Sequence, residues 1–322
     1  MEVVFGSERV SPLPPAPPAG AAGGGPGARA VAIGNFDGVH LGHRQVLSRL
    51  AEMARTRGLS AWVYTFDPPP TMVIAPERHQ PRLVTLPRKL ELLADLGIAG
   101  VVVEPFTPAF AAQSAETFAR LVLRDRLSAA VVVVGWDFRF GAGRDGDSDA
   151  LRAAARGLDV EQVAPFLMEG APVSSSRIRR LITAGSVEEA AKLLGRPHRL
   201  SGKVVHGDAR GRTIGVPTAN LQSDVECLPA AGVYAVSVGL PAVEAGKARA
   251  RRLGVLNVGV RPTFNGTELR VEAHVLDWEG DLYGQHLDLD LLALIREERR
   301  FSSVDALVAQ IRQDIAVARR LA

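Results

Sequence analysis

The sequence predicts two domains of different classes: an α/β domain with a parallel sheet, then a mainly β domain that forms an antiparallel barrel or sandwich. Three observations lead to this fold class. The chain has 322 residues, enough for two domains. Short apolar runs alternate with helical patterns in the first part. Apolar and polar residues alternate with period two in the second part. We expect the domains to cover residues 1–186 and 187–322.

In the first domain, the expected strands are apolar along their whole length. They cover residues 30–33, 61–66, 101–103 and 131–134. Apolar residues at helical spacing occupy segments between and beside them, over residues 41–57, 86–96 and 114–126. Such strands, alternating with helices, are typical of a parallel sheet that is covered on both faces.

The second domain is expected to begin with a helix over residues 187–195, which Gly195 closes. Four alternating runs follow, separated by Gly, Pro and Asn, over residues 232–238, 253–258, 269–276 and 286–292. Several short strands of this kind indicate an antiparallel barrel or sandwich. A last helix is expected over residues 303–321.

The N-terminal region contains a low-complexity segment. Residues 11–29 are almost entirely Pro, Ala and Gly. A segment of this composition cannot build a packed core and is typical of a flexible loop. We therefore expect ordered structure to begin near Ala30.

Composition excludes several function classes. Lys and Arg total 38 against 35 Asp and Glu, a surplus too small to indicate a nucleic-acid partner. Cys227 is the only cysteine, which excludes an internal disulfide and a cysteine-rich zinc site. No apolar run approaches the roughly 18 residues of a membrane span. The N-terminus also lacks the features of a secretory signal. We expect a cytoplasmic protein without a membrane partner.

The first strand and the first helix are joined by a glycine-rich turn with two histidines, GNFDGVHLGH, residues 34–43. A helix N-terminus presents unpaired N–H groups, which suit phosphate. His40 and His43 share a face of the first helical turn and could donate hydrogen bonds to phosphoryl oxygens. The same spacing also fits a metal site or a helix cap. The position after the first parallel strand favours a nucleotide.

Two further segments of the first part could contact a ligand. Residues 134–141 (VGWDFRFG) follow the fourth strand, at the edge where α/β sheets bind ligands. They also fit a strand end with core phenylalanines. Residues 173–179 (VSSSRIR) combine hydroxyls and arginines at a helix start, where Ser can cap N–H groups and Arg can grip phosphate. A capped helix without a ligand is the alternative.

A basic segment punctuated by four glycines opens the second domain, residues 202–221 (GKVVHGDARGRTIGVPTANL). Its backbone N–H groups could cradle phosphate, although its spacing is not that of a P-loop. Thr218 and Asn220 project to the same side of an extended chain. Their oxygens suit Mg²⁺ beside ATP. A glycine-rich hairpin is the alternative.

One expected strand carries a candidate base. Arg270, Glu272 and His274 share one face of it, and apolar residues occupy the other. Glu272 could accept the proton of an attacking alcohol. A solvated glutamate without a chemical role is the alternative.

These separated motifs, in this order, resemble those of the bacterial bifunctional riboflavin kinase/FMN adenylyltransferases, or FAD synthetases. Residues 34–43 are similar to the His-x-Gly-His signature of nucleotidylyltransferases, and residues 202–221 to the riboflavin kinase signature. The resemblance runs from about residue 30 to about residue 320. It implies a Rossmann-like nucleotidylyltransferase domain and an antiparallel β-barrel kinase domain with a terminal helix.

The resemblance also implies roles for individual residues. Catalysis falls to His40, His43 and Glu272, and magnesium binding to Thr218 and Asn220. Flavin binding falls to Asp137, Phe138 and Arg296. ATP and phosphate binding fall to Gly34, Phe36, Asp37, Gly38, Ser175, Ser176, Arg179, Gly202, Gly207 and Gly215. The run from Asn257 to Phe264 also matches and is expected on the flavin side.

The implied activity has two steps. ATP with Mg²⁺ phosphorylates riboflavin to FMN, and a second ATP adenylylates FMN to FAD with release of pyrophosphate. Riboflavin, FMN and ATP are thus the expected partners of a monomer or weak homo-oligomer. Pro69 stands where the family usually has His. The alternative is therefore a riboflavin kinase with an impaired adenylyltransferase domain.

Overall fold

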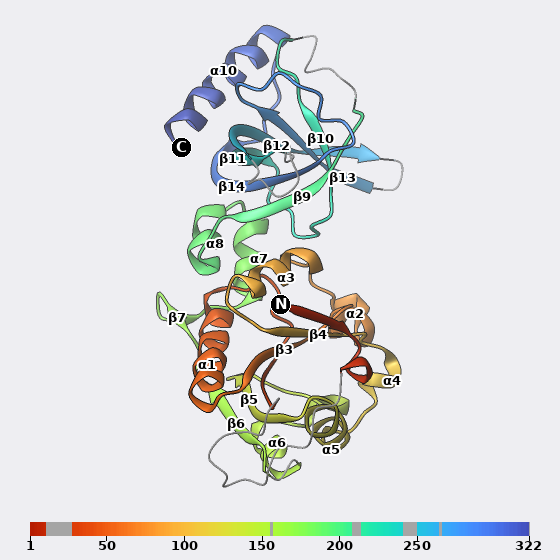
Figure 1. Ribbon diagram of the computed structural model, residues 1–322. Coiled ribbons are helices and arrows are strands. Elements are labelled where there is room, and N and C mark those ends of the chain that lie inside the picture. Colours follow the sequence, from red (N-terminus) through yellow and green to blue (C-terminus); the bar gives the residue numbers. More distant parts are fainter. Residues whose placement is uncertain (11–27, 155–156, 208–213, 241–249, 264–265, 322) are drawn as a thin grey trace. The chain divides into compact units, whose positions relative to one another are not determined.

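The computed structural model describes residues 1–10, 28–154, 157–207, 214–240, 250–263 and 266–321 (Figure 1). These residues form two compact units, which are described separately. The first contains Met1–Gln80 and Leu86–Ser174, and the second contains Pro81–Thr85 and Ser175–Ala322. Helices α7 (Ser175–Thr183) and α8 (Val187–Leu194) belong to the second unit. The functional division after residue 186 stays a prediction.

The first unit contains a six-stranded parallel sheet in the order β1-β4-β3-β2-β5-β6. Its strands are β1 (Glu2–Phe5), β2 (Arg29–Ile33), β3 (Ser60–Phe66), β4 (Gly100–Glu104), β5 (Ala129–Gly135) and β6 (Asp159–Val163). Every residue of β2 and β4 is buried, as expected for central strands covered on both faces. The four strands expected from the sequence are confirmed, and β1 and β6 are additional.

The expectation that ordered structure begins near Ala30 is wrong for the first ten residues. Strand β1 pairs with the edge of β4, and Val10 is only 4% exposed. The backbone N–H of Ser7 donates a 2.9 Å hydrogen bond to Glu104. The low-complexity segment separates the short apolar run Val3-Val4-Phe5 from the other strands, and β1 is held by backbone pairing with a strand almost a hundred residues away. Most of the low-complexity segment, residues 11–27, lies outside the described residues.

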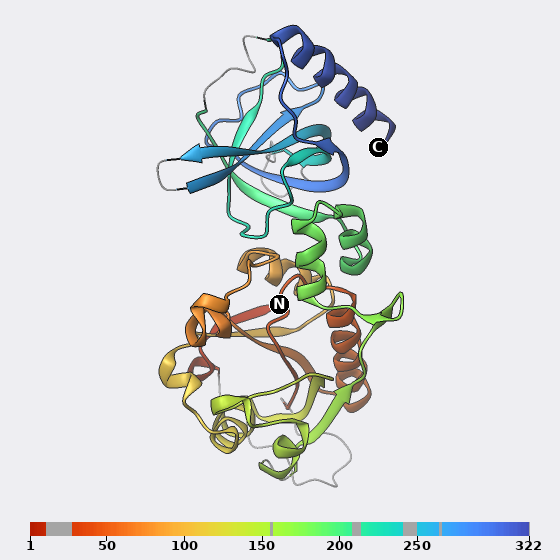
Figure 2. The same cartoon turned by 180° about the vertical axis from the view of Figure 1, so that it is seen from behind.

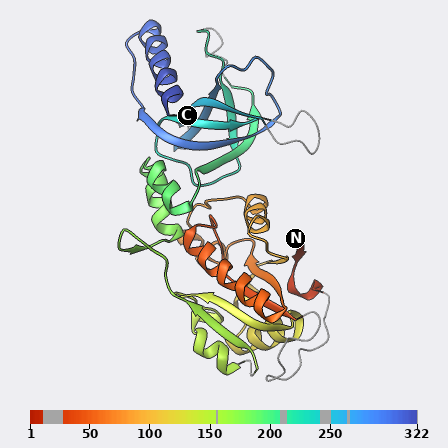
Figure 3. The ribbon, with the colours of Figure 1, turned by 60° about the vertical axis from the view of Figure 1, so that its left-hand side comes forward.

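Helix α1 (Leu41–Arg57) lies along the sheet and ends at Gly58 in the left-handed conformation (Figure 3). Further helices are η1 (Ser7–Arg9), α2 (Pro70–Ile74), η2 (Pro76–Arg78), α3 (Leu86–Ala94), α4 (Pro108–Ala111), η4 (Ala142–Arg144) and α6 (Ser148–Ala154). A short helix α5 (Ala115–Thr117) continues as the π-helical η3 (Phe118–Arg126). The helices expected from the sequence are therefore present. Strands β7 (Leu167–Met168) and β8 (Ala171–Pro172) form a small hairpin.

The second unit contains a closed antiparallel barrel in the order β10-β13-β12-β11-β14-β9 (Figure 2). Its strands are β9 (His198–Val205), β10 (Ala219–Ser223), β11 (Gly232–Gly239), β12 (Arg251–Thr263), β13 (Gly266–Val275) and β14 (His286–Glu297). The sequence left a barrel or a sandwich open, and pairing of β9 with β10 decides for the barrel. The interior is apolar, with Leu200, Leu256 and Leu289 fully buried.

The terminal helix α10 (Val304–Arg320) packs on the outside of this barrel. Ala318 and Ile315 contact an apolar group that includes Val233 and Val255. Helix α10 confirms the terminal helix that the sequence predicts over residues 303–321. Within the part of the chain that the structure describes, none of the helices has the length and apolar character needed to cross a membrane.

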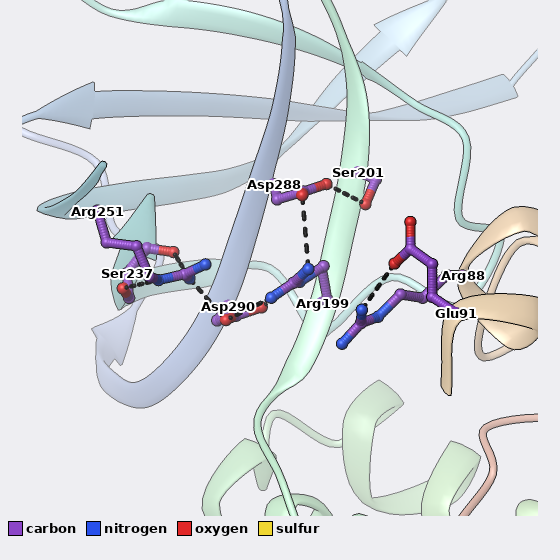
Figure 4. Close-up of polar contacts among 8 residues, drawn as sticks. All are labelled: Arg88, Glu91, Arg199, Ser201, Ser237, Arg251, Asp288 and Asp290. Carbon is purple, nitrogen blue, oxygen red and sulfur yellow. Dashed lines mark hydrogen bonds and ion pairs between the residues drawn. The ribbon is translucent and has the colours of Figure 1, made fainter. Parts of the chain in front are cut away.

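A network of charged side chains connects β9 and β14 on the outer wall of the barrel (Figure 4). The Arg199 guanidinium donates to both carboxylate oxygens of Asp290, at 2.6 and 3.0 Å. Asp288 accepts from the Ser201 hydroxyl at 2.8 Å, and Arg251 donates to Asp290 at 2.6 Å. Paired carboxylates and guanidinium groups at low exposure hold neighbouring strands in register. The network thus stabilises the closed barrel.

Candidate active sites

The turn between β2 and α1 is held in an unusual backbone conformation. Phe36 and Val39 have φ angles of 47° and 40°, in the left-handed region. Both side chains are buried, at 2% and 0% exposure. Burial of this kind compensates for local backbone strain, and such strain occurs at ligand sites. Asp37 and Gly38, between these two anchors, are thus fixed at the carboxyl end of β2, where parallel sheets bind ligands.

His40 and His43 lie against each other at the start of α1. Their rings stack with centroids 3.6 Å apart, and Phe36 meets His43 edge-on at 5.2 Å. His40 is the N-cap: its Nδ1 accepts the backbone N–H of His43 at 3.2 Å. The capping alternative is therefore correct for His40. Because Nδ1 is an acceptor, the hydrogen of the neutral ring is on Nε2. His40 can thus cap the helix and also donate from Nε2.

The segment after β5 presents Asp137 and two aromatic side chains, Phe138 and the exposed Trp136. Asp137 is exposed, and Phe138 is half-buried and stacks on Phe140 at 5.2 Å. Phe140 is 9% exposed and belongs to the core, so the core alternative holds for that phenylalanine. Asp147 pairs with Arg139 at 3.0 Å, which ties the loop together. The Ala150 N–H, followed by the Asp149 N–H and Arg139, lowers the pKa of Asp147 below its ordinary value.

Sequence reasoning missed an aromatic group at the same sheet edge. Phe66 ends β3, and Phe106 comes just after β4. Phe110 contacts both, with ring centroids 6.1 and 5.5 Å away, and contacts the core residue Phe118. The signal was available, because ligand-contacting residues follow the carboxyl ends of parallel strands. Phe66 and Phe110 keep partial exposure, so they can offer ring surface to a planar ligand.

The Ser/Arg segment crosses the boundary between the units: Val173 and Ser174 belong to the first unit, and α7 with Ser175 begins in the second. The expected helix start is confirmed, since α7 begins at Ser175. Ser176 is exposed, and Arg179 donates from Nε to the Pro81 carbonyl at 2.7 Å. The phosphate contacts of Ser175, Ser176 and Arg179 stay a prediction.

In the barrel, Glu272 lies directly between two asparagines. The strand register pairs it with Asn220 on β10 and with Asn257 on β12. Residues paired in this way project to the same face. The neighbours of Glu272, Val271 and Ala273, are buried in the interior, so the three polar side chains face outward. Glu272 is half-buried and lies 3.7 Å from Arg270. The alternation read from the sequence is confirmed.

Thr218 directly precedes β10 and is half-buried, so its hydroxyl lies near the start of the same strand as Asn220. A Cβ added at Gly207 would overlap the Asn220 amide, so this glycine leaves room for that side chain. Gly215 is in the left-handed region at φ 75°. Residues 208–213 of the glycine segment lie outside the described residues.

A pocket opens beside Thr218 in the barrel. Its wall includes Ala219 and Ala273 from the strands, and Trp278 and Tyr283 from the segment after β13. His206 stacks on Tyr283 with ring centroids 4.0 Å apart. Aromatic rings beside a hydroxyl are suited to a planar base attached to a polar chain. The pocket and the row of polar residues meet at Thr218.

Gly202 has a structural explanation within β9. A Cβ at this position would overlap the carbonyl oxygen of Gln222, which is backbone and cannot move freely. We expect Gly202→Ala to destabilise the chain by about 1–3 kcal/mol because the β9–β10 seam must open. Urea unfolding would measure this loss, with Gly135→Ala as the control, because a Cβ there meets only Asp137 Oδ1 at an ordinary contact distance of 3.5 Å. A wild-type midpoint for Gly202→Ala would contradict the prediction. The role of Gly202 in phosphate binding stays a prediction.

Arg296 is engaged with the terminal helix. Its guanidinium forms a two-pronged pair with Asp314, at 3.1 Å from Nε and 3.0 Å from Nη2, and lies over the Phe301 ring at 5.5 Å. Asp314 is only 2% exposed. Val233 pairs with both Asn257 and Arg296, so Arg296 lies two strands beyond Asn257 on the outer wall. Its flavin role stays a prediction.

This buried pair gives a stability prediction. Asp314→Ala would leave the largely buried Arg296 guanidinium without its counter-charge. We expect this to lower the free energy of unfolding by about 3–5 kcal/mol. The matched control is Asp277→Ala, because Asp277 pairs with Arg319 of the same helix at 62% exposure. Exposed ion pairs of this kind contribute little to the free energy of unfolding. Urea unfolding of both variants should show a large loss for the first only. Equal midpoints would contradict the prediction.

Comparisons with known proteins match the two parts of the chain to two enzyme families. The family model described as FAD synthetase matches residues 26–177, and the riboflavin kinase model matches residues 194–322. A bifunctional riboflavin kinase/FMN adenylyltransferase of Escherichia coli K12 is 42% identical over 90% of this chain and 91% of its own length. One of Pseudomonas fluorescens is 39% identical over 90% and 92%. A crystal structure named as a macrolide-efflux protein of Streptococcus pneumoniae has a TM-score of 0.85 and 31% identity, covering 99% of each chain.

The fold and sites, with these matches, define an enzyme class that joins a nucleotidylyltransferase domain to a kinase barrel. Both domains match their family models, and the matched relatives carry both activities in their names. The chain belongs to the bifunctional riboflavin kinase/FMN adenylyltransferase family. This finding favours the bifunctional enzyme over a kinase with an impaired adenylyltransferase.

Proposed function

We propose that this chain makes FAD in two steps at two separate sites. In the barrel, riboflavin and ATP give FMN and ADP. In the α/β unit, FMN and a second ATP give FAD and pyrophosphate. The observation that carries the kinase assignment is the register that sets Glu272 beside Asn220 on a shared face. A base and an oxygen donor that are held on neighbouring strands keep their spacing through turnover.

At the kinase site, Glu272 accepts the proton of the riboflavin 5′-hydroxyl as that oxygen attacks the γ-phosphorus. The bond from the γ-phosphorus to the bridging oxygen of ADP breaks. Thr218 Oγ1 and Asn220 Oδ1 are neutral, hard oxygens, which fit Mg²⁺ when ATP oxygens complete its ligands. The cation offsets charge on the phosphates. Gly207 and Gly215 let the backbone approach the phosphates, and the aromatic pocket beside Thr218 takes the adenine.

At the adenylyltransferase site, an oxygen of the FMN phosphate attacks the α-phosphorus of ATP and pyrophosphate leaves. That phosphate is ionised near neutral pH, so no strong base is needed. His40 Nε2 and His43 donate to phosphoryl oxygens, and the turn with Gly34, Asp37 and Gly38 holds the chain of phosphates at the helix N-terminus. Ser175, Ser176 and Arg179 are assigned to phosphate binding by their hydroxyl and guanidinium groups.

The flavin ring is assigned to aromatic and charged side chains in each unit. In the α/β unit, Asp137 and Phe138 follow β5, and the Phe138 ring connects to Phe66 and Phe110 through the ring contacts of Phe140 and Phe118. In the barrel, Arg296 marks the flavin side of the outer wall. We assign the enzyme to the cytoplasm, as a monomer or weak homo-oligomer.

A time course of flavin chromatography tests the proposal. With riboflavin and Mg-ATP, FMN should appear first and FAD should follow. Incubation with FMN and ATP alone should release pyrophosphate and form FAD. FMN without FAD would leave only the kinase. Flavin binding without ATP consumption would indicate a binding protein and overturn both activities.

A further inference from the structure

The histidine two residues after Glu272 contacts the loop that carries the predicted magnesium donors. His274 Nδ1 lies 2.8 Å from the backbone oxygen of Pro217. A carbonyl oxygen can only accept, so Nδ1 must carry the hydrogen. The tautomer of His274 is thereby fixed, with Nε2 as the acceptor of the neutral ring. Glu272 and His274 project to the same face of β13.

The hydrogen bond from His274 to Pro217 lies just beyond the end of the backbone pairing between β10 and β13. The ladder between β10 and β13 begins at Ala219, opposite Ala273. Pro217 and Thr218 come just before it and have no regular structure. Pro217 also has no N–H to donate. Within the described residues, the Pro217 carbonyl is thus tied to β13 by a side chain rather than by the ladder.

The tie acts on the position of Thr218. The Pro217 carbonyl belongs to the peptide unit that ends at the Thr218 nitrogen, and this unit is planar. A hydrogen bond to that oxygen therefore fixes the peptide plane from which Thr218 continues. The Thr218 hydroxyl and the Asn220 amide oxygen must bind one cation together. Rotation of the Pro217–Thr218 peptide plane would move the hydroxyl away from the position in which both oxygens can bind that cation.

The geometry points to His274 as a positioning residue of the kinase site, which holds the Pro217–Thr218 peptide so that magnesium–ATP meets both donors. This inference rests on the proposed function of the barrel. His274 contacts neither substrate in this role. It acts through the backbone, so its loss changes nucleotide binding more than the chemical step.

The test compares three variants of the full chain. We expect His274→Ala to raise the KM for Mg-ATP in FMN formation about tenfold, with kcat falling less than about threefold. His274→Asn places an amide N–H near the position of Nδ1 and should restore the KM to within about threefold of wild type. His274→Gln reaches farther and should not restore it. The Kd of Mg-ADP, measured by calorimetry without turnover, should change in the same order.

Two controls separate this inference from the proposed function. His286→Ala removes a barrel histidine that pairs with Asp224 at 48% exposure, and should leave KM unchanged. Conversion of added FMN to FAD uses the other unit and shows in every variant that the α/β unit is intact. Wild-type KM and Kd in His274→Ala would overturn the inference. So would Asn and Gln variants that behave alike, a comparison that holds even if the alanine variant fails to fold. Absence of FMN formation in the wild-type chain would instead overturn the proposed function.

Discussion

The His43→Ala variant should lose FAD formation by at least about 100-fold while it still makes FMN from riboflavin. The reason is the loss of one donor to phosphoryl oxygens where charge develops in the transition state. The substitution is local, because the cap of α1 uses the His40 ring and the backbone N–H of residue 43, which alanine keeps. Helix α1 should therefore form normally, and the effect should appear in kcat/KM for FMN adenylylation.

The companion variant His40→Ala separates capping from catalysis. It removes both the Nε2 donor and the Nδ1 cap, so it should lose FAD formation and also about 1 kcal/mol of stability. His43→Ala should lose the activity with little loss of stability. FMN formation in the barrel serves as the internal control for both. Parallel loss of FMN and FAD in His43→Ala would argue against separate sites, and unchanged FAD formation would remove the histidine pair from the mechanism.

The sequence predicted most of the elements because their signals are local. Runs such as residues 131–134 and 101–103 are apolar throughout, and the alternation around Glu272 gave the correct face of its strand. Strand β1 carries the short apolar run Val3-Val4-Phe5, but the low-complexity segment separates it from the other strands, and its partner β4 lies far away in the sequence. The register between Asn220 and Glu272 is equally non-local.

The candidate sites were predicted as residue types but not as contacts. For the His40–His43 pair, the sequence left phosphate, metal and cap open, and only the Nδ1 contact shows that the cap forms. Asn220 was read within a glycine segment, whereas it belongs to the strand that closes the barrel. Phe66 and Phe110 lie about 44 positions apart in the chain, and their contact depends on how β3 and α4 pack. Such contacts follow from tertiary packing, which periodicity does not encode.

The Glu272→Gln variant should lose FMN formation and keep FAD formation, which is the opposite of His43→Ala. Glutamine keeps the size of the side chain and its place between Asn220 and Asn257, but its amide cannot take up the proton of the riboflavin hydroxyl. We expect kcat for FMN formation to fall by about 100- to 10,000-fold. The KM for ATP should change little, because the predicted donors Thr218 and Asn220 remain. Added FMN should be converted to FAD at the wild-type rate.

The control for this variant is Glu297→Gln, which neutralises an exposed glutamate at the end of β14 in the same barrel. If the effect of Glu272→Gln came only from lost charge on the barrel, the two variants would behave alike. A base acting at one atom predicts that only Glu272→Gln loses kcat. Retention of FMN formation in Glu272→Gln would show that the ribityl hydroxyl needs no protein base there, and the outward row on β10, β13 and β12 would then bind substrate without taking its proton.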